Sequence, residues 1–140
     1  MSLYVVDASV AIKLYVPETH SAHAIRLFSD GHELIVPEFM LAEVANVVWK
    51  KSSLLGELSE AEAQAIVAAV QEMPFGYYYT SGLLPDAMRI ALSTKRTVYD
   101  SLYIALAASQ ECQLVTDDRK LYESLQATSW AKFLTLIENY

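Results

Sequence analysis

The chain has 140 residues, 54% of them hydrophobic, a size and composition typical of one globular domain rather than of a disordered protein. Seventeen acidic and ten basic residues give a formal net charge of −7, which argues against a protein that grips nucleic acid through its overall electrostatic field. The single cysteine excludes an internal disulfide and a metal cluster held by several thiolates of one chain.

No apolar stretch approaches the roughly 18 residues that a membrane-spanning helix needs. No basic segment with a cleavage site precedes the first predicted strand. We therefore expect a single cytoplasmic domain over residues 1–140, with no membrane contact.

The first half of the chain alternates strands with helices. Residues 3–6 form a continuous apolar run, typical of a strand buried on both faces of a parallel sheet, and this run stops at Asp7. The helix over residues 37–51 is apolar nearly all round, which predicts a buried position. The expected elements are a strand at 3–6, a helix at 8–16, a helix at 19–30 with Thr19 as its N-cap, a strand at 33–36 and a helix at 37–51.

The second half continues the alternation. Ser59 and Glu62 have the spacing of a capping box, which predicts a helix start. The expected elements are helices at 59–73, 81–95, 100–108 and 119–125, and strands at 75–79 and 113–116. Residues 130–136 are expected to form a last edge strand, with a helix as the alternative. Helices alternating with short buried strands predict an α/β fold in which helices cover both faces of a central parallel sheet.

Acidic side chains stand at several of these predicted boundaries. Taken singly, Asp7, Asp100 and either Asp117 or Asp118 precede helices, where Asp is favoured as an N-cap and by the helix dipole. Glu43 differs because it lies in the middle of an apolar helix, where an ionised carboxylate needs a cation, a metal or a hydrogen-bond network. Asn46, three residues further along that helix, is a plausible neighbour for Glu43.

Taken together, the acidic side chains predict a metal site. Asp7 and the pair Asp117 and Asp118 end predicted parallel strands, so they share one edge of the sheet, and buried helices carry Glu43 and Asp100 toward that edge. Carboxylates gathered in this way repel one another unless a cation lies among them. Oxygen ligands alone select a hard ion such as Mg²⁺ or Mn²⁺.

The histidines do not suggest zinc. His20, His23 and His32 lie in an early helix and turn, and we expect them to be solvated. A carboxylate site for a hard metal serves phosphodiester hydrolysis, and it would let an acidic protein meet RNA or DNA through the ion.

Four segments of the chain resemble the PIN-domain ribonucleases, and most closely the VapC-type toxins of toxin–antitoxin pairs. The segments are Val-Val-Asp-Ala-Ser, Leu-Ala-Glu-Val-Ala-Asn, Tyr-Asp-Ser-Leu-Tyr-Ile-Ala-Leu-Ala and Leu-Val-Thr-Asp-Asp-Arg-Lys-Leu, in order over residues 3–122. The resemblance implies a three-layer α/β/α fold with a central parallel sheet of four to five short strands. It also implies an endoribonuclease that depends on Mg²⁺ or Mn²⁺, a homodimer, and an antitoxin whose tail occupies the cleft.

The same resemblance implies which residues form the site. The four acids that carry over are Asp7, Glu43, Asp100 and Asp118. The family's last motif is Thr-x-Asp, so Asp117 is an additional carboxylate in the variable position and a further candidate ligand. Ser9 and Thr116 match small hydroxyl residues that support the acids by hydrogen bonds, and Asn46 is the remaining candidate supporting residue.

Contacts to RNA are predicted less specifically. Lys13, Arg96 and Arg119 are the basic residues nearest the acidic motifs, and they are the preferred candidates for phosphate contacts. The aromatic run at 77–79 could stack bases, although packing in a strand or a dimer seam is the commoner role.

Two interpretations from other classes stay open at the level of sequence. One is a non-catalytic PIN-like module that uses its cleft to hold a partner or RNA, and the other is a structural role in which the acids are caps. A haloacid-dehalogenase-like phosphatase fits poorly, because it needs a second Asp where this chain has Ser9. A receiver domain fits poorly too, because it needs adjacent acids where this chain has Asp7 and Ala8.

Overall fold

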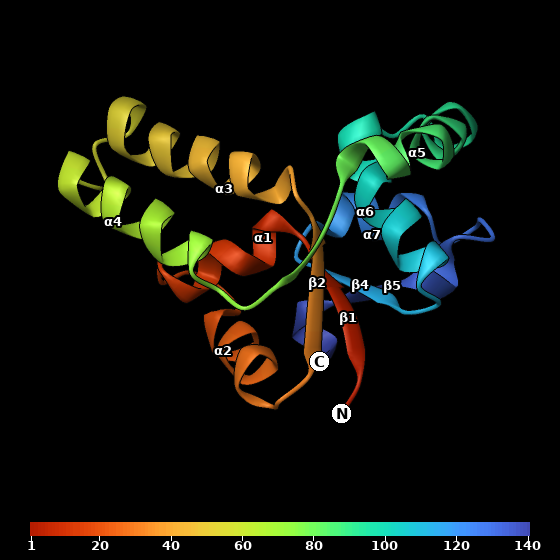
Figure 1. Cartoon of the computed structure of the whole chain (residues 1–140), viewed down its shortest axis with the longest axis horizontal. Helices are drawn as coiled ribbons and strands as arrows, with labels where there is room; N and C mark the ends of the chain where they lie inside the picture. The colour runs from red at the N-terminus through yellow and green to blue at the C-terminus, as the bar shows by residue number, and fades with distance from the viewer.

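The computed structural model describes residues 1–140 and contains one five-stranded sheet in which every neighbouring pair is parallel. The strand order is β3-β2-β1-β4-β5, so β1 lies in the centre (Figure 1). Val5 of β1 aligns with Ile35 of β2 on one side and with Leu114 of β4 on the other. The strands are β1 (Leu3–Val6), β2 (Glu33–Pro37), β3 (Gly76–Tyr78), β4 (Gln113–Thr116) and β5 (Leu134–Leu136). The predicted parallel sheet is confirmed.

The strand order places a topological switch between β1 and β4. The chain builds β1, β2 and β3 toward one edge and then returns to add β4 and β5 on the other side of β1. In open α/β sheets, ligands bind at such a switch, outside the carboxyl ends of the strands. Asp7 follows β1 and Asp117 follows β4, so both stand at this point.

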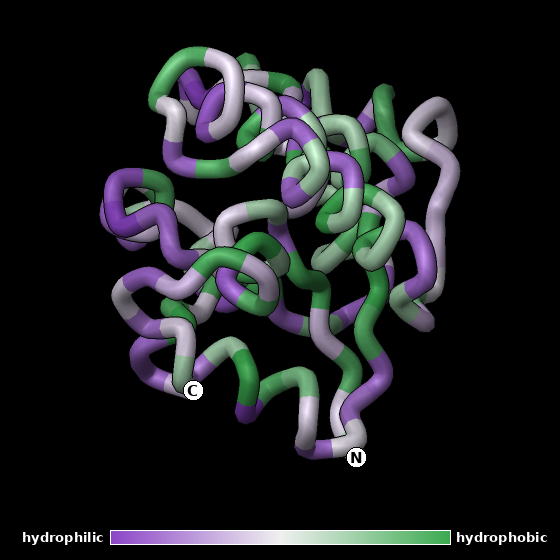
Figure 2. Tube along the Cα trace, turned by 90° about the vertical axis from the view of Figure 1, so that its left-hand side faces the viewer, coloured by the Kyte–Doolittle hydropathy of each residue, from purple (hydrophilic) through white to green (hydrophobic).

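Helices cover both sides of the sheet, with α1 to α4 on one side and α5 to α7 on the other (Figure 1). The α-helices are α1 (Ala8–Ala11), α2 (Ser21–Ser29), α3 (Met40–Trp49), α4 (Glu60–Gln71), α5 (Thr80–Thr94), α6 (Val98–Ser109) and α7 (Arg119–Ser124). Short 3-10 helices extend α1 (η1, Ile12–Leu14) and flank β5 (η3, Ala131–Phe133; η4, Ile137–Asn139). Figure 2 shows hydrophobic stretches along the interior segments and hydrophilic stretches in the outer turns.

The two helices predicted to be buried all round behave differently. Every residue of α6 from Ser101 to Ala107 is buried, as predicted, because α6 packs on strands and on α5. The prediction is wrong for α3, where only Met40, Val44 and Val48 are fully buried and Trp49 is 53% exposed. This helix packs against α1 and α4 with one face, and its other face is open.

Local signals in the sequence fix some helix ends better than others. The capping box of Ser59 and Glu62 is present at the start of α4, as predicted. Thr19 does not cap α2; that helix begins one residue after His20, whose backbone has a positive φ of 69°. No helix has the length and hydropathy needed to span a bilayer.

Candidate active site

Asp7 is the most buried acid at the switch point, with 7% of its surface exposed. Both carboxylate oxygens accept a hydroxyl hydrogen, Oδ1 from Ser9 Oγ at 2.5 Å and Oδ2 from Thr116 Oγ1 at 2.5 Å. Oδ1 also caps α1 by accepting from the Val10 N–H at 3.3 Å. Asp7 is therefore both a cap and a side chain held in one orientation by two hydroxyls.

Burial raises the pKa of the Asp7 carboxyl from 3.8 to about 7. The hydrogen bonds from Ser9, Thr116 and Val10 act in the opposite direction, and the negative charge of Glu43 adds to the rise. A carboxyl group of this kind is only partly ionised at neutral pH unless a cation stabilises its charge.

The two supporting hydroxyls are themselves oriented by the backbone after β4. The Asp117 N–H donates to Ser9 Oγ at 2.9 Å, and the Asp118 N–H donates to Thr116 Oγ1 at 3.0 Å. Successive peptide groups thus hold the hydroxyls that hold Asp7. The structure places Ser9 and Thr116 where the sequence predicts supporting residues.

Glu43 reaches the site from α3. The hydroxyl of Tyr103, on α6, donates to Glu43 Oε1, and Tyr103 itself is only 3% exposed. Burial raises the pKa of the Glu43 carboxyl; the hydrogen bond from Tyr103 opposes the rise and the charge of Asp100 adds to it. Burial also raises the pKa of Tyr103 well above its ordinary value, with further contributions from the charges of Glu43 and Asp7.

Asp100 lies in the first turn of α6, and its Oδ2 accepts a hydrogen bond from Arg96 at 3.1 Å. The Nε of Arg96 is buried and has no hydrogen-bond partner. Asp7, Glu43 and Asp100 therefore form a row in which each carboxylate acts electrostatically on the next. Sequence reasoning missed Tyr103, although it follows Asp100 by three residues and so lies on the same side of α6.

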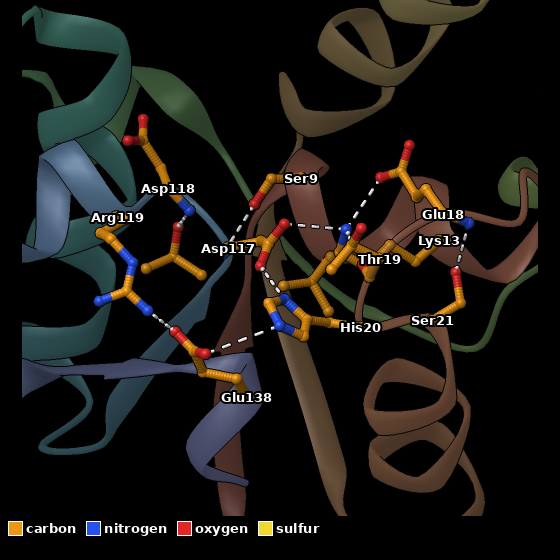
Figure 3. A network of polar contacts seen from close by, with 12 residues as sticks. Ser9, Lys13, Glu18, Thr19, His20, Ser21, Asp117, Asp118, Arg119 and Glu138 are labelled. Atoms are coloured by element: carbon orange, nitrogen blue, oxygen red, sulfur yellow. Dashed lines mark hydrogen bonds and ion pairs between the residues drawn. The ribbon is translucent and has the colours of Figure 1, made fainter.

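Asp117 and Asp118 diverge although they are consecutive (Figure 3). Asp118 is the N-cap of α7, and its Oδ1 accepts from the Leu121 N–H at 3.0 Å. The Asp117 carboxylate instead pairs with Lys13 at 2.8 Å and with His20 at 3.0 Å. Its oxygens are thus occupied by basic groups of the chain.

Three other predicted residues lie elsewhere than expected. His20 is only 29% exposed, and its ring contacts Asp117 and lies 3.6 Å from Glu138. Lys13 is buried and paired, so its ammonium group does not face solvent as a phosphate contact would. Asn46 is exposed on α3, and no hydrogen bond joins it to Glu43.

The donor set suits a hard cation. Asp7, Glu43, Asp100 and Asp118 offer carboxylate oxygens only, the ligands that Mg²⁺ and Mn²⁺ prefer. No group of three or more acidic, histidine or cysteine side chains lies close enough together to hold a metal ion in this structure. Burial is the main cause of the raised pKa values of Asp7 and Glu43, a neighbouring carboxylate adds to each, and a cation would offset both effects. The chemical type of these donors therefore fits a divalent ion, while their spacing in this structure does not form a complete ligand set.

Comparisons with known proteins give the family and the fold of the chain. Residues 4–124 match the sequence model of the PIN domain. Ribonuclease VapC3 from Pyrobaculum aerophilum is 38% identical over 125 residues, which are 88% of this chain and 95% of that protein. The crystal structure of PAE2754 from Pyrobaculum aerophilum has a TM-score of 0.74 at 27% identity, covering 99% of this chain and 85% of the other. A toxin–antitoxin complex from Klebsiella pneumoniae has a TM-score of 0.67 at 15% identity, covering 96% and 97%, and shares the fold.

Proposed function

Since the chain belongs to the PIN-domain family and is a VapC-type ribonuclease, we propose that it is the toxin of a toxin–antitoxin pair and that its active site is a four-carboxylate centre for Mg²⁺ or Mn²⁺. The proposed ligands are Asp7, Glu43, Asp100 and Asp118. The proposed reaction is internal cleavage of RNA by hydrolysis of a phosphodiester bond.

One observation carries this proposal. Asp7 is buried and its carboxyl has a pKa of about 7, yet its hydroxyl hydrogen bonds favour the ionised form. Burial disfavours the negative charge of the carboxylate, whereas the hydroxyl donors favour it. A bound cation suits such a site, because the cation compensates the charge that burial disfavours.

Each residue has a distinct part in the proposed mechanism. A divalent ion, when bound, polarises the phosphate and activates water. Ser9 and Thr116 keep Asp7 in one orientation, and Tyr103 fixes Glu43, which either holds the ion or orients the attacking water as a base. Arg96 pairs with Asp100 and its side chain is partly exposed, and it is the proposed phosphate contact.

Two protein partners complete the proposal. The relative from Klebsiella pneumoniae is a toxin–antitoxin complex, and we extend an antitoxin partner to this chain, with a tail that occupies the acidic cleft. We also propose a homodimer. Three apolar side chains at helical spacing, Leu84, Met88 and Leu92, are exposed along α5 and form a stripe that a second copy can cover. Light scattering tests this, since Met88→Glu would dissociate such a dimer.

The deciding experiment is thermal unfolding of purified, partner-free protein with and without Mn²⁺. At about 100 times its dissociation constant, an ion that binds only the folded state adds roughly 2.7 kcal/mol to the free energy of unfolding. We expect this stabilisation in the wild type and its loss in Asp100→Asn. Asp86→Asn is the matched control, because Asp86 is an exposed carboxylate of α5 paired with Arg89. No stabilisation of the wild type would contradict the metal site.

A further inference from the structure

A cluster of paired charges borders the acidic site on the side of α1 and the loop before α2 (Figure 3). Its centre is Lys13, which is 3% exposed. The ammonium group has three acceptors: Glu18 Oε1 at 2.9 Å, the Thr19 carbonyl oxygen at 2.8 Å and Asp117 Oδ2 at 2.8 Å. An ammonium group has three hydrogens to donate, so the buried cation is fully satisfied.

Asp117 is held on both carboxylate oxygens. Lys13 binds Oδ2, and the Nδ1 of His20 lies 3.0 Å from Oδ1. His20 in turn faces Glu138, which pairs with Arg119. The left-handed backbone of His20 directs its ring into this cluster (Figure 3). The Asp117 side chain is therefore fixed by basic groups on both of its carboxylate oxygens.

The backbone of the same residue acts on the acidic site. The Asp117 N–H donates to Ser9 Oγ at 2.9 Å, and Ser9 Oγ donates to Asp7 Oδ1 at 2.5 Å. Because the peptide N–H occupies an acceptor position of the hydroxyl, the hydroxyl hydrogen is directed to Asp7. A continuous path thus runs from the Lys13 ion pair through Asp117 and Ser9 to Asp7.

We infer that Asp117 is a positioning residue: its ion pair with the buried Lys13 fixes the peptide that holds Ser9, and thereby orients Asp7 for the metal. The inference rests on the proposed four-carboxylate site and assigns Asp117 a place outside the ligand set. Partners that orient a ligand in this way commonly change metal affinity or activity by roughly 10- to 100-fold when they are removed.

A double-mutant cycle on Mn²⁺ affinity tests the path. We expect Ser9→Ala and Asp117→Ala each to weaken Mn²⁺ binding roughly 10- to 100-fold, measured by calorimetric titration. The double variant should bind about as weakly as the weaker single variant, since both changes break one path. Asp117→Asn should recover part of the affinity, because an amide oxygen still accepts from Lys13. If Asp117→Ala weakens binding by the same factor with and without Ser9, Asp117 acts independently, as a ligand or through general stability, and the inference is wrong.

A metal-free measurement separates this inference from the proposed function. Hydrogen exchange of the Asp117 amide reports directly on its bond to Ser9. In protein without metal, we expect Lys13→Met to speed the exchange of the Asp117 amide about tenfold or more. The exchange of the Leu121 amide, which donates a hydrogen bond to Asp118, should be unchanged. An unchanged Asp117 amide would overturn the inference even if the wild type binds Mn²⁺. A wild type that exchanges as expected but binds no Mn²⁺ would instead overturn the proposed function and, with it, the metal role of the path.

Discussion

Two acidic regions meet at the carboxyl ends of β1 and β4, and they differ in how their charge is balanced. Asp7 and Glu43 receive hydrogen bonds from neutral hydroxyls and form no ion pair. Asp117 and Glu138 lie against Lys13, His20 and Arg119. The first region raises the pKa values of its carboxyls, and the second neutralises its carboxylates with cations of the chain. Consecutive aspartates can therefore have different chemistry, because the fold supplies cations to only one of them.

The largest expected effect is a difference in RNA cleavage between variants of the two consecutive aspartates. Asp118→Asn should lower cleavage of an RNA that the wild type cuts by about 10³-fold or more, because a neutral amide oxygen balances the charge of a hard cation less well than a carboxylate does. The fold should survive, since Asn is as good an N-cap as Asp. Asp117→Asn should lower cleavage by only about tenfold or less. The reverse order of effects would mean that Asp117 belongs to the metal site.

The pH dependence of stability separates the two regions without any metal. The pKa of Asp7 is raised from 3.8 to about 7, so between these values the folded state keeps a proton that the unfolded state has lost. This group therefore stabilises the fold fully below about pH 4, and its contribution is lost as the pH rises through about 7. The loss is on the order of 4 kcal/mol.

Urea unfolding of metal-free protein from pH 4 to pH 8 measures this loss. Asp7→Asn cannot ionise, so its stability relative to the wild type should rise steadily over this range. Asp117→Asn is the matched control and should show no such rise. If the wild type and Asp7→Asn have parallel pH profiles, Asp7 ionises without cost and the need for a cation in the first region disappears.

The sequence predicts the first region far better than the second. Asp7 and Asp118 follow apolar runs that end abruptly, so strand ends, parallel pairing and a shared edge can be inferred from local pattern. The partners of Asp117 cannot be inferred in this way. Lys13 and His20 are separated from it by about a hundred residues, and nothing in their local pattern distinguishes a buried, paired group from a solvated one.

The open face of α3 shows the same limit. Its apolar residues predict burial all round, but the number of faces that neighbours cover depends on tertiary packing that no periodicity encodes. The opposite outcome for α6, which is similarly apolar, comes from its place between the sheet and α5.

A smaller effect is expected from the ion pair of the second region. Lys13→Met should lower the free energy of unfolding by roughly 2 to 3 kcal/mol, because Glu18, Asp117 and the Thr19 carbonyl lose a buried donor. Arg89→Ala, which breaks the exposed pair with Asp86, should change it by only about 0.5 kcal/mol or less. Added salt should reduce only the loss of stability caused by Arg89→Ala, since buried ion pairs are screened much less than exposed ones. Equal losses in the two variants would show that Lys13 is solvated and that the second region does not fix Asp117.

The smallest expected effect concerns a neutral donor of the first region. Tyr103→Phe removes the hydroxyl that donates to Glu43 and leaves the buried ring in place, so the fold should be retained while cleavage falls about tenfold. Tyr4→Phe is the control, because Tyr4 lies on β1 and packs against His32 and Tyr140, away from the acids. Mn²⁺ affinity should fall with cleavage if Glu43 is a ligand. If cleavage falls and Mn²⁺ affinity does not, Glu43 acts on water as a base, because the hydroxyl then orients a side chain that takes part in attack without holding the ion.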